Sequence, residues 1–133
     1  MRLASRSSIL LCAATLLLGG CNSSVPAPAT MPYAETGVHF AVTPVGADCG
    51  PDGQYTANVE WELPAAMSPR IEIQLDAQER KVFARSDERK GSEKTGQWVK
   101  PGLAFYLLDR QADRVIAALD AGSSHCVTPL PAR

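Results

Sequence analysis

Alternation of apolar and polar residues is the clearest signal in this chain. Between positions 55 and 63 one parity holds apolar side chains and the other parity holds polar ones. The apolar set is Tyr55, Ala57, Val59, Trp61 and Leu63, and the polar set is Thr56, Asn58, Glu60 and Glu62. Because successive side chains of a strand point to opposite faces, this pattern predicts a half-buried β-strand, which Pro64 ends.

Shorter runs repeat the pattern on both sides. Residues 70–76 place Ile71, Ile73 and Leu75 on one parity, and residues 38–42 predict an earlier strand before Pro44. Weaker signals for strands lie at 81–85 and 96–99. Strand signals about every ten residues, with turn residues between them, are typical of sandwiches. We therefore predict an all-β fold, a small antiparallel β-sandwich of about seven strands.

Residues 102–121 allow two interpretations. As a hairpin, 103–108 and 114–119 are strands joined by a turn at 109–113. As a helix over about 104–120, which would make the fold α+β, Leu108, Ala112, Val115 and Leu119 form an apolar stripe at helical spacing. The pairs Phe105-Tyr106 and Val115-Ile116 favour strands, so the hairpin is the preferred interpretation.

The first 21 residues have the form of an export signal. Arg2 and Arg6 precede an apolar run that is too short to span a bilayer, and the run ends in Leu18-Gly19-Gly20-Cys21. This ending resembles the lipobox of bacterial lipoprotein precursors. The resemblance implies that a helical signal peptide, residues 1–20, is cleaved between Gly20 and Cys21, and that Cys21 carries a diacylglycerol thioether and acyl chains such as palmitate. It also implies that Asn22, which is not Asp, directs the protein to the outer membrane.

The length and net charge of the mature chain indicate how many domains it holds and which partners it could bind. Removing 20 of 133 residues leaves 113, enough for one small domain. We expect residues 21–36, rich in Pro, Ser and Ala, to be a disordered tether and residues 37–133 to form a single domain. Without Arg2 and Arg6 the balance is 11 − 14 = −3, which gives no reason to expect nucleic acid as a partner.

Two cysteines remain after the lipid acceptor and Cys12 of the leader are set aside. In an oxidising compartment Cys49 and Cys126 are expected to form a disulfide. The bond would close a span of 126 − 49 = 77 positions, for which the chain-entropy model gives about 4 kcal/mol. The pattern CxxC does not occur, and His39 and His125 show no ligand spacing, so we expect no metal and no cofactor.

Few residues point to chemistry. Glu60 and Glu62 on one predicted strand, and Glu72 and Asp76 on another, could act as acid–base or calcium groups, but they occupy the polar parity, where a solvated face is expected. The sequence holds no known catalytic motif, so no catalytic residue is assigned and the chain is not expected to be an enzyme. Residues 76–94 carry balanced charge and predict a solvated segment, either a long hairpin tip or a loop, which could serve as a polar docking loop for a protein partner.

The segment Trp98-Val99-Lys100-Pro101-Gly102-Leu103 is similar to an edge strand, a Pro-Gly corner and a core strand. With the order of the elements, it makes the domain resemble immunoglobulin-like or fibronectin-type-III-like sandwiches, an architectural likeness that carries no activity. These features support two hypotheses. The first is a lipid-anchored protein of the cell envelope whose domain binds another envelope protein or plays a structural role. The second is a small-ligand or glycan binder that uses Trp98 and Tyr106 as exposed aromatic residues.

Overall fold

The computed structural model describes residues 25–46 and 48–123. The predicted signal peptide, its cleavage point at Gly20 and Cys21, and Cys126 lie outside these ranges, so their assignments stay predictions. Among the residues described, no helix has the length and apolar content needed to cross a membrane.

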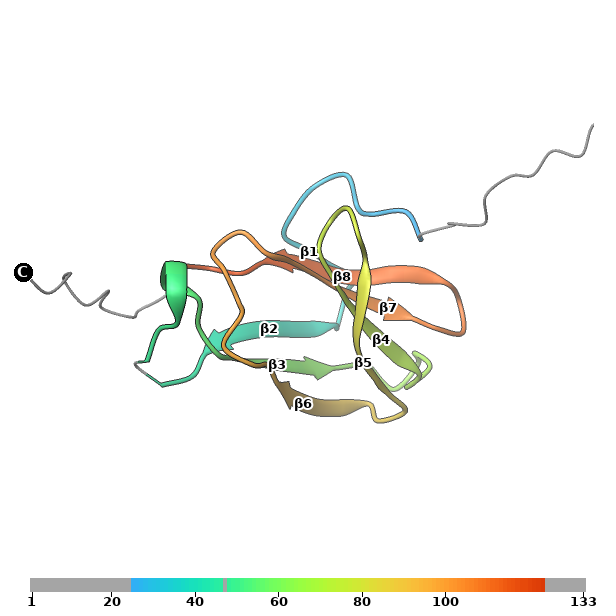
Figure 1. Ribbon diagram of the computed structural model, residues 1–133. Helices are drawn as coiled ribbons and strands as arrows, with labels where there is room; N and C mark the ends of the chain where they lie inside the picture. The colour runs from blue at the N-terminus through green and yellow to red at the C-terminus, as the bar shows by residue number, and fades with distance from the viewer. Residues whose placement is uncertain (1–24, 47, 124–133) are drawn as a thin grey trace, which may run out of the picture.

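Two antiparallel sheets pack face to face in the described part of the chain (Figure 1). The five-stranded sheet has the order β1-β8-β7-β4-β5, and the three-stranded sheet has the order β2-β3-β6. The strands are β1 (Tyr33–Ala34), β2 (His39–Pro44), β3 (Ala57–Glu62), β4 (Ile71–Leu75), β5 (Lys81–Ser86), β6 (Lys90–Lys94), β7 (Ala104–Asp109) and β8 (Arg114–Asp120). A single 3₁₀ turn, η1 (Pro51–Gly53), accompanies them in this part of the chain. The predicted all-β sandwich is confirmed.

The core between the sheets follows the parity of the sequence. On β3 the residues Ala57, Val59 and Trp61 are buried, whereas Glu60 and Glu62 are exposed. Opposite them lie Ile71 and Ile73 of β4, Phe105 and Leu107 of β7, and Ile116 of β8. The longest alternating run in the sequence is thus the central strand of the smaller sheet.

The hairpin interpretation of residues 102–121 is confirmed, and the helix over about 104–120 is wrong. Strands β7 and β8 pair along their lengths, with Leu108 opposite Val115. The Asp109 carboxylate accepts hydrogen bonds from the backbone N–H groups of Gln111 and Ala112, at 2.9 and 3.2 Å. This side-chain turn starts the reversal, which overrides the weak helical preference of the alanines.

The strand expected at 81–85 is confirmed, but the charged segment 76–94 as a whole is not simply a hairpin tip or loop. It holds the edge strands β5 and β6, while the expected strand at 96–99 is reduced to one bridge between Tyr55 and Val99. Edge strands often carry charged side chains, because these discourage pairing with other chains. The charged composition therefore hides β6, which the sequence does not predict.

The predicted tether also needs correction. Val25 and Met31 pack on the outer face of the five-stranded sheet, and Tyr33–Ala34 pairs with β8. Beyond β1 the backbone N–H of Glu35 donates to the carbonyl of Ile116, at 2.9 Å. Residues 25–36 are therefore part of the domain, whose boundary lies earlier than residue 37. We call residues 25–32 the strap.

Candidate binding surfaces

The two sheets present different outer faces. The strap covers apolar residues of the five-stranded sheet, and Figure 1 shows this blue segment running over β7 and β8, with the three-stranded sheet on the opposite side. The covered residues are Ala104, Tyr106, Leu108, Val115 and Ala118. The other sheet has an uncovered outer face with mostly polar side chains, which we call the polar face. It comprises His39, Ala41, Thr43, Asn58, Glu60, Glu62, Lys90, Ser92 and Lys94.

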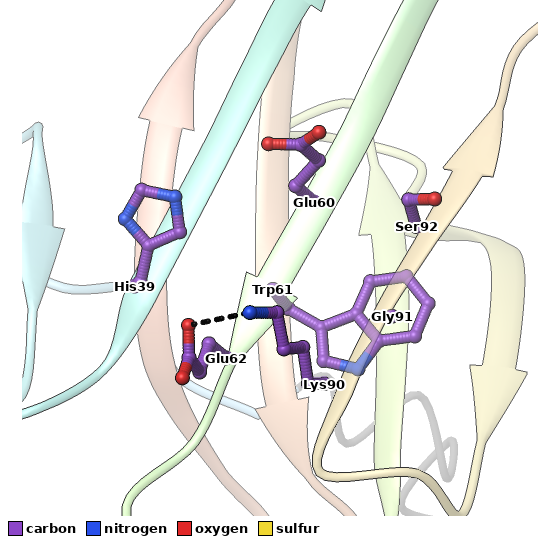
Figure 2. A pocket seen from close by; sticks show the side chains of 7 residues that line it. All are labelled: His39, Glu60, Trp61, Glu62, Lys90, Gly91 and Ser92. Atoms are coloured by element: carbon purple, nitrogen blue, oxygen red, sulfur yellow. Dashed lines mark ion pairs between the residues drawn. The ribbon is translucent and has the colours of Figure 1, made fainter.

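A groove of about 460 Å³ lies on the polar face (Figure 2). The three strands each supply part of it: His39 from β2, Glu60 and Glu62 from β3, Lys90 and Ser92 from β6. Antiparallel register places His39, Glu62 and Lys90 side by side, and Lys90 Nζ lies 3.6 Å from Glu62 Oε2. The groove therefore offers carboxylates, an ammonium group and an imidazole to a polar partner.

Trp61 supports this groove from the core side. Its indole Nε1 donates to the carbonyl of Glu88 at 3.0 Å, and the ring crosses Gly91 on the neighbouring strand. A Cβ atom on Gly91 would lie only 2.4 Å from Trp61 Cζ2. Glycine at position 91 is thus required for the indole to lie across β6.

The acidic residues singled out in the sequence do not converge. Glu60 and Glu62 face solvent on the three-stranded sheet, as their parity predicts, and Glu60 accepts a hydrogen bond from Asn58 Nδ2 at 3.0 Å. Asp76 lines a different depression beyond β4. Glu72 is paired with Arg85 at 2.8 Å. Within residues 25–46 and 48–123, no group of three or more His, Cys, Asp or Glu side chains is arranged to hold a metal ion.

Trp98 remains accessible, as the ligand-binding hypothesis requires. It is 37% exposed and makes an edge-to-face contact with Phe83 of β5, with ring centroids 5.7 Å apart. A side chain on Gly96 would lie 2.8 Å from the indole, so this glycine leaves room for the ring. Trp98 is held in place while part of its surface contacts solvent.

Tyr106, in contrast, is wrongly predicted to be an exposed aromatic residue. It is 3% exposed, and the Arg80 guanidinium lies over its ring, 4.1 Å from the centroid. Arg80 Nε donates to Gln74 Oε1 at 2.9 Å. Burial lowers the pKa of Arg80, and the neighbouring Tyr106 opposes that shift. Tyr106 faces outward from its sheet, but the strap and Arg80 cover that face.

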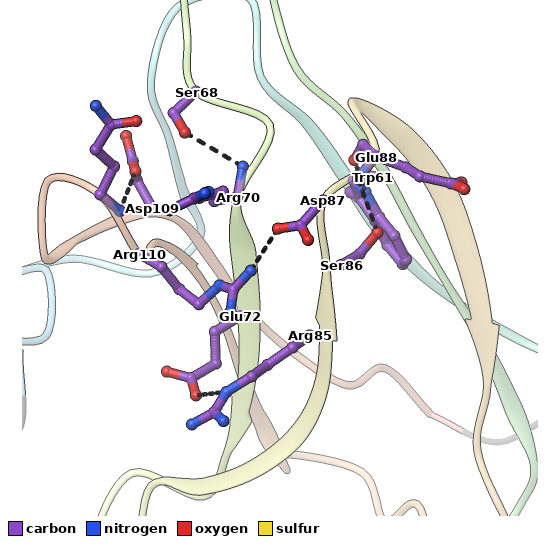
Figure 3. A network of polar contacts seen from close by, with 11 residues as sticks. Trp61, Ser68, Arg70, Glu72, Arg85, Ser86, Asp87, Glu88, Asp109 and Arg110 are labelled. Carbon is purple, nitrogen blue, oxygen red and sulfur yellow. Dashed lines mark hydrogen bonds and ion pairs between the residues drawn. The ribbon is translucent and has the colours of Figure 1, made fainter.

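Charged residues at one end of the sandwich bind one another (Figure 3). Arg110, in the turn after β7, reaches Asp87 between β5 and β6 at 2.6 Å. Ser86 Oγ accepts from the backbone N–H of Glu88 at 3.0 Å. Much of the charge in residues 76–94, a candidate docking loop by sequence, therefore serves contacts inside the domain.

One ion pair that fixes the chain just after the strap and β1 escapes prediction from the sequence. Arg114 of β8 donates from Nε and Nη2 to the two oxygens of Glu35, each at 2.9 Å, and this pairing raises the pKa of Arg114. One signal for a cover is present. Strand β7 is apolar on both parities from Ala104 to Leu108, which is typical of strands buried on both faces.

The predicted disulfide pairs Cys49 with a residue outside the described ranges, so it stays a prediction. Nearby, the Tyr55 hydroxyl donates to the carbonyl of Gly122 at 2.7 Å. This contact brings the chain six positions after Cys49 close to the chain four positions before Cys126. Comparison of the chain with protein-family models, with curated proteins and with solved structures gave no match.

Proposed function

We propose that this chain is a lipid-anchored protein of the bacterial cell envelope, attached through Cys21 to the outer membrane. Its sandwich domain acts as a binding or structural accessory module for another envelope protein. The observation that carries the proposal is the sequence Leu18-Gly19-Gly20-Cys21, which stands four positions before a segment packed on a folded domain. Anchor and domain are thus joined almost directly.

Acylation can be tested in a bacterial host by labelling with a palmitate analogue. We expect the label on the wild-type chain and on Cys12→Ser, because Cys12 leaves with the leader. Cys21→Ser should be unlabelled and should leave the membrane fraction. A wild-type chain that keeps its leader, or that carries an unmodified thiol at position 21, would contradict the anchor.

The polar face is the surface that we propose for the protein partner. It is uncovered, it is continuous over three strands, and its groove combines Glu60 and Glu62 with Lys90 and His39. Such mixed charge suits a polar protein surface, where complementary charges give specificity more than affinity. Trp98 lies outside this face, against Phe83 of β5 in the other sheet, and is not part of the proposed surface.

This role can be tested by photo-cross-linking in cells. A photoreactive side chain at Ser92, on the polar face, should yield a discrete adduct with one envelope protein. The same side chain at Ala29, on the strap, is the matched control and should not give that adduct. The adduct should weaken in a Lys90→Glu variant, which removes the ammonium group. Absence of any discrete adduct from Ser92 would argue against the polar face.

A small-ligand or glycan binder is the second candidate, and the exposure of Trp98 favours it. An indole face can stack on a sugar ring, although the burial of Tyr106 leaves only one of the two predicted aromatic residues available. Soluble oligosaccharides should change the tryptophan emission of the wild-type protein and not that of Trp98→Phe, in which Trp61 still emits. An unchanged wild-type spectrum at millimolar oligosaccharide would dismiss this candidate.

A further inference from the structure

The strap follows the proposed anchor closely in the sequence and has no charged side chain. From Asn22 to Ala34 the sequence contains no acidic or basic residue. Pro26, Ala27 and Ala29 are exposed, and a groove of about 440 Å³ runs between the strap and the start of β8. Val25, Pro28 and Val115 are among the apolar residues that line this groove, and Asp113 and Arg114 of the neighbouring turn and strand line another part of it.

Chain length fixes how far this surface can be from the lipid. Four residue steps separate Cys21 from Val25, and a fully extended chain spans at most about 3.6 Å per residue. The backbone of Val25 can therefore lie no more than about 14 Å from the acylated cysteine. A tether ending at residue 36 would allow roughly 45 Å in an extended state, at about 3.1 Å per residue. Because the strap packs on the domain, most of that possible distance between the domain and the lipid is lost.

We call the strap and the outer side of the five-stranded sheet that it covers the strap face. From these facts we infer that the strap face rests on the lipid surface and that the polar face points away from it. This inference depends on the proposed anchor at Cys21. The two sheets of a sandwich are about 10 Å apart, so their outer faces are separated by roughly 20 Å with side chains included. With Val25 held near the lipid, the groove around Glu60 and Glu62 lies on the far side of the domain, on the three-stranded sheet (Figure 1).

The charges of the two faces do not oppose this orientation. The strap itself has no charged side chain, but Asp113 and Arg114 line the groove beside it. The polar face carries Lys90 and Lys94 as well as Glu60 and Glu62. Opposite charges therefore nearly balance on both faces, so attraction to or repulsion from anionic lipids favours neither, and the short connection to Cys21 carries the orientation. The partner that meets the exposed face is therefore one that approaches from the aqueous side, and the lipid surface is the occupant of the strap face.

The orientation can be measured on the full acylated protein, purified from membranes and reconstituted in vesicles that contain a lipid with a nitroxide headgroup. A fluorescent side chain is placed at Ala29 in one variant and at Ser92 in a matched variant, since both residues are small and exposed. We expect several-fold stronger quenching at Ala29 than at Ser92. Equal quenching, or stronger quenching at Ser92, would overturn the inference.

Two controls separate this result from failure of the anchor. Mass spectrometry of the N-terminal peptide first establishes acylation, and a chain without acyl groups overturns the proposed function before orientation is measured. Inserting ten Gly and Ser residues between Ser24 and Val25 lifts the length limit, so quenching at Ala29 should fall toward the value at Ser92. Undiminished quenching in the insertion variant would refute the short connection as the cause.

Discussion

Gly91→Ala tests how tightly the ring of Trp61, on β3, packs against the backbone of β6. The added methyl group would lie 2.4 Å from Cζ2 and 2.9 Å from Cε2 of Trp61, a buried ring in the core of the sandwich. Something must move, and the indole is the group in contact. Its displacement would also weaken the hydrogen bond from Nε1 to the carbonyl of Glu88.

The expected cost has two parts. Forcing a methyl group into a packed core costs about 1–3 kcal/mol. Loss of a hydrogen bond to a partly buried carbonyl adds about 0.5–1.5 kcal/mol. We therefore expect Gly91→Ala to lower the free energy of unfolding by about 1.5–4.5 kcal/mol.

Urea unfolding, followed by tryptophan fluorescence under oxidising conditions, measures this free energy. Gly122→Ala is the matched control, because a Cβ at Gly122 would meet no atom within 4 Å and the change should be nearly neutral. In Trp61→Phe the smaller ring makes room, so adding Gly91→Ala to that variant should cost much less than it does alone. A Gly91→Ala protein as stable as the wild type would refute the packing argument.

Three other properties of the chain can be tested by single or paired substitutions. Burial raises the pKa of Tyr55 above its ordinary value of 10.0, so the folded protein favours the neutral phenol; stability should fall as pH rises above about 10, and Tyr55→Phe should flatten that fall in alkaline urea titrations. If Cys49 and Cys126 are bonded, Cys49→Ser with Cys126→Ser should lower the free energy of unfolding by about 4 kcal/mol, and a thiol reductant should have no further effect on that variant. If the sorting rule of lipoproteins applies, Asn22→Asp should move the acylated chain from outer-membrane to inner-membrane fractions on a density gradient, and an unchanged distribution would reject the assignment to the outer membrane.

The pattern of apolar and polar residues predicts β3 and the hairpin of β7 and β8, because short stretches of sequence decide how these elements pack. The alternation from Tyr55 to Leu63 fixes which face of β3 is buried, because a shift of one residue would place Glu60 and Glu62 in the core. Aromatic and β-branched pairs predict the hairpin of β7 and β8 in the same way. For these elements the deciding information lies within a stretch of fewer than twenty residues, 55–63 for β3 and 104–120 for the hairpin.

Other features depend on contacts between distant segments. The strap contains three prolines and little apolar bulk, so by itself it has the composition of a linker; it packs because the outer face of β7 needs a cover. The close approach of Gly91 to Trp61 depends on the register of β3 and β6, which are 30 positions apart at these residues. The burial of Tyr106 escapes prediction because the strap and Arg80, which lie on its outer side, come from elsewhere in the chain.

The strap also affects which interaction can orient the domain on the membrane: apolar contact with lipid, attraction to anionic headgroups, or the short connection to Cys21. Without it, the five-stranded sheet would expose Tyr106, Leu108 and Val115, an apolar face that could itself enter a lipid surface. Because the strap already covers these residues, little apolar surface is left there, and the hydrophobic effect contributes little to binding of this face to lipid. The strap brings no cations that would attract anionic headgroups. Orientation must then come mainly from the short connection to Cys21, and it should change little when salt is added or when the anionic lipid content of the vesicles is varied.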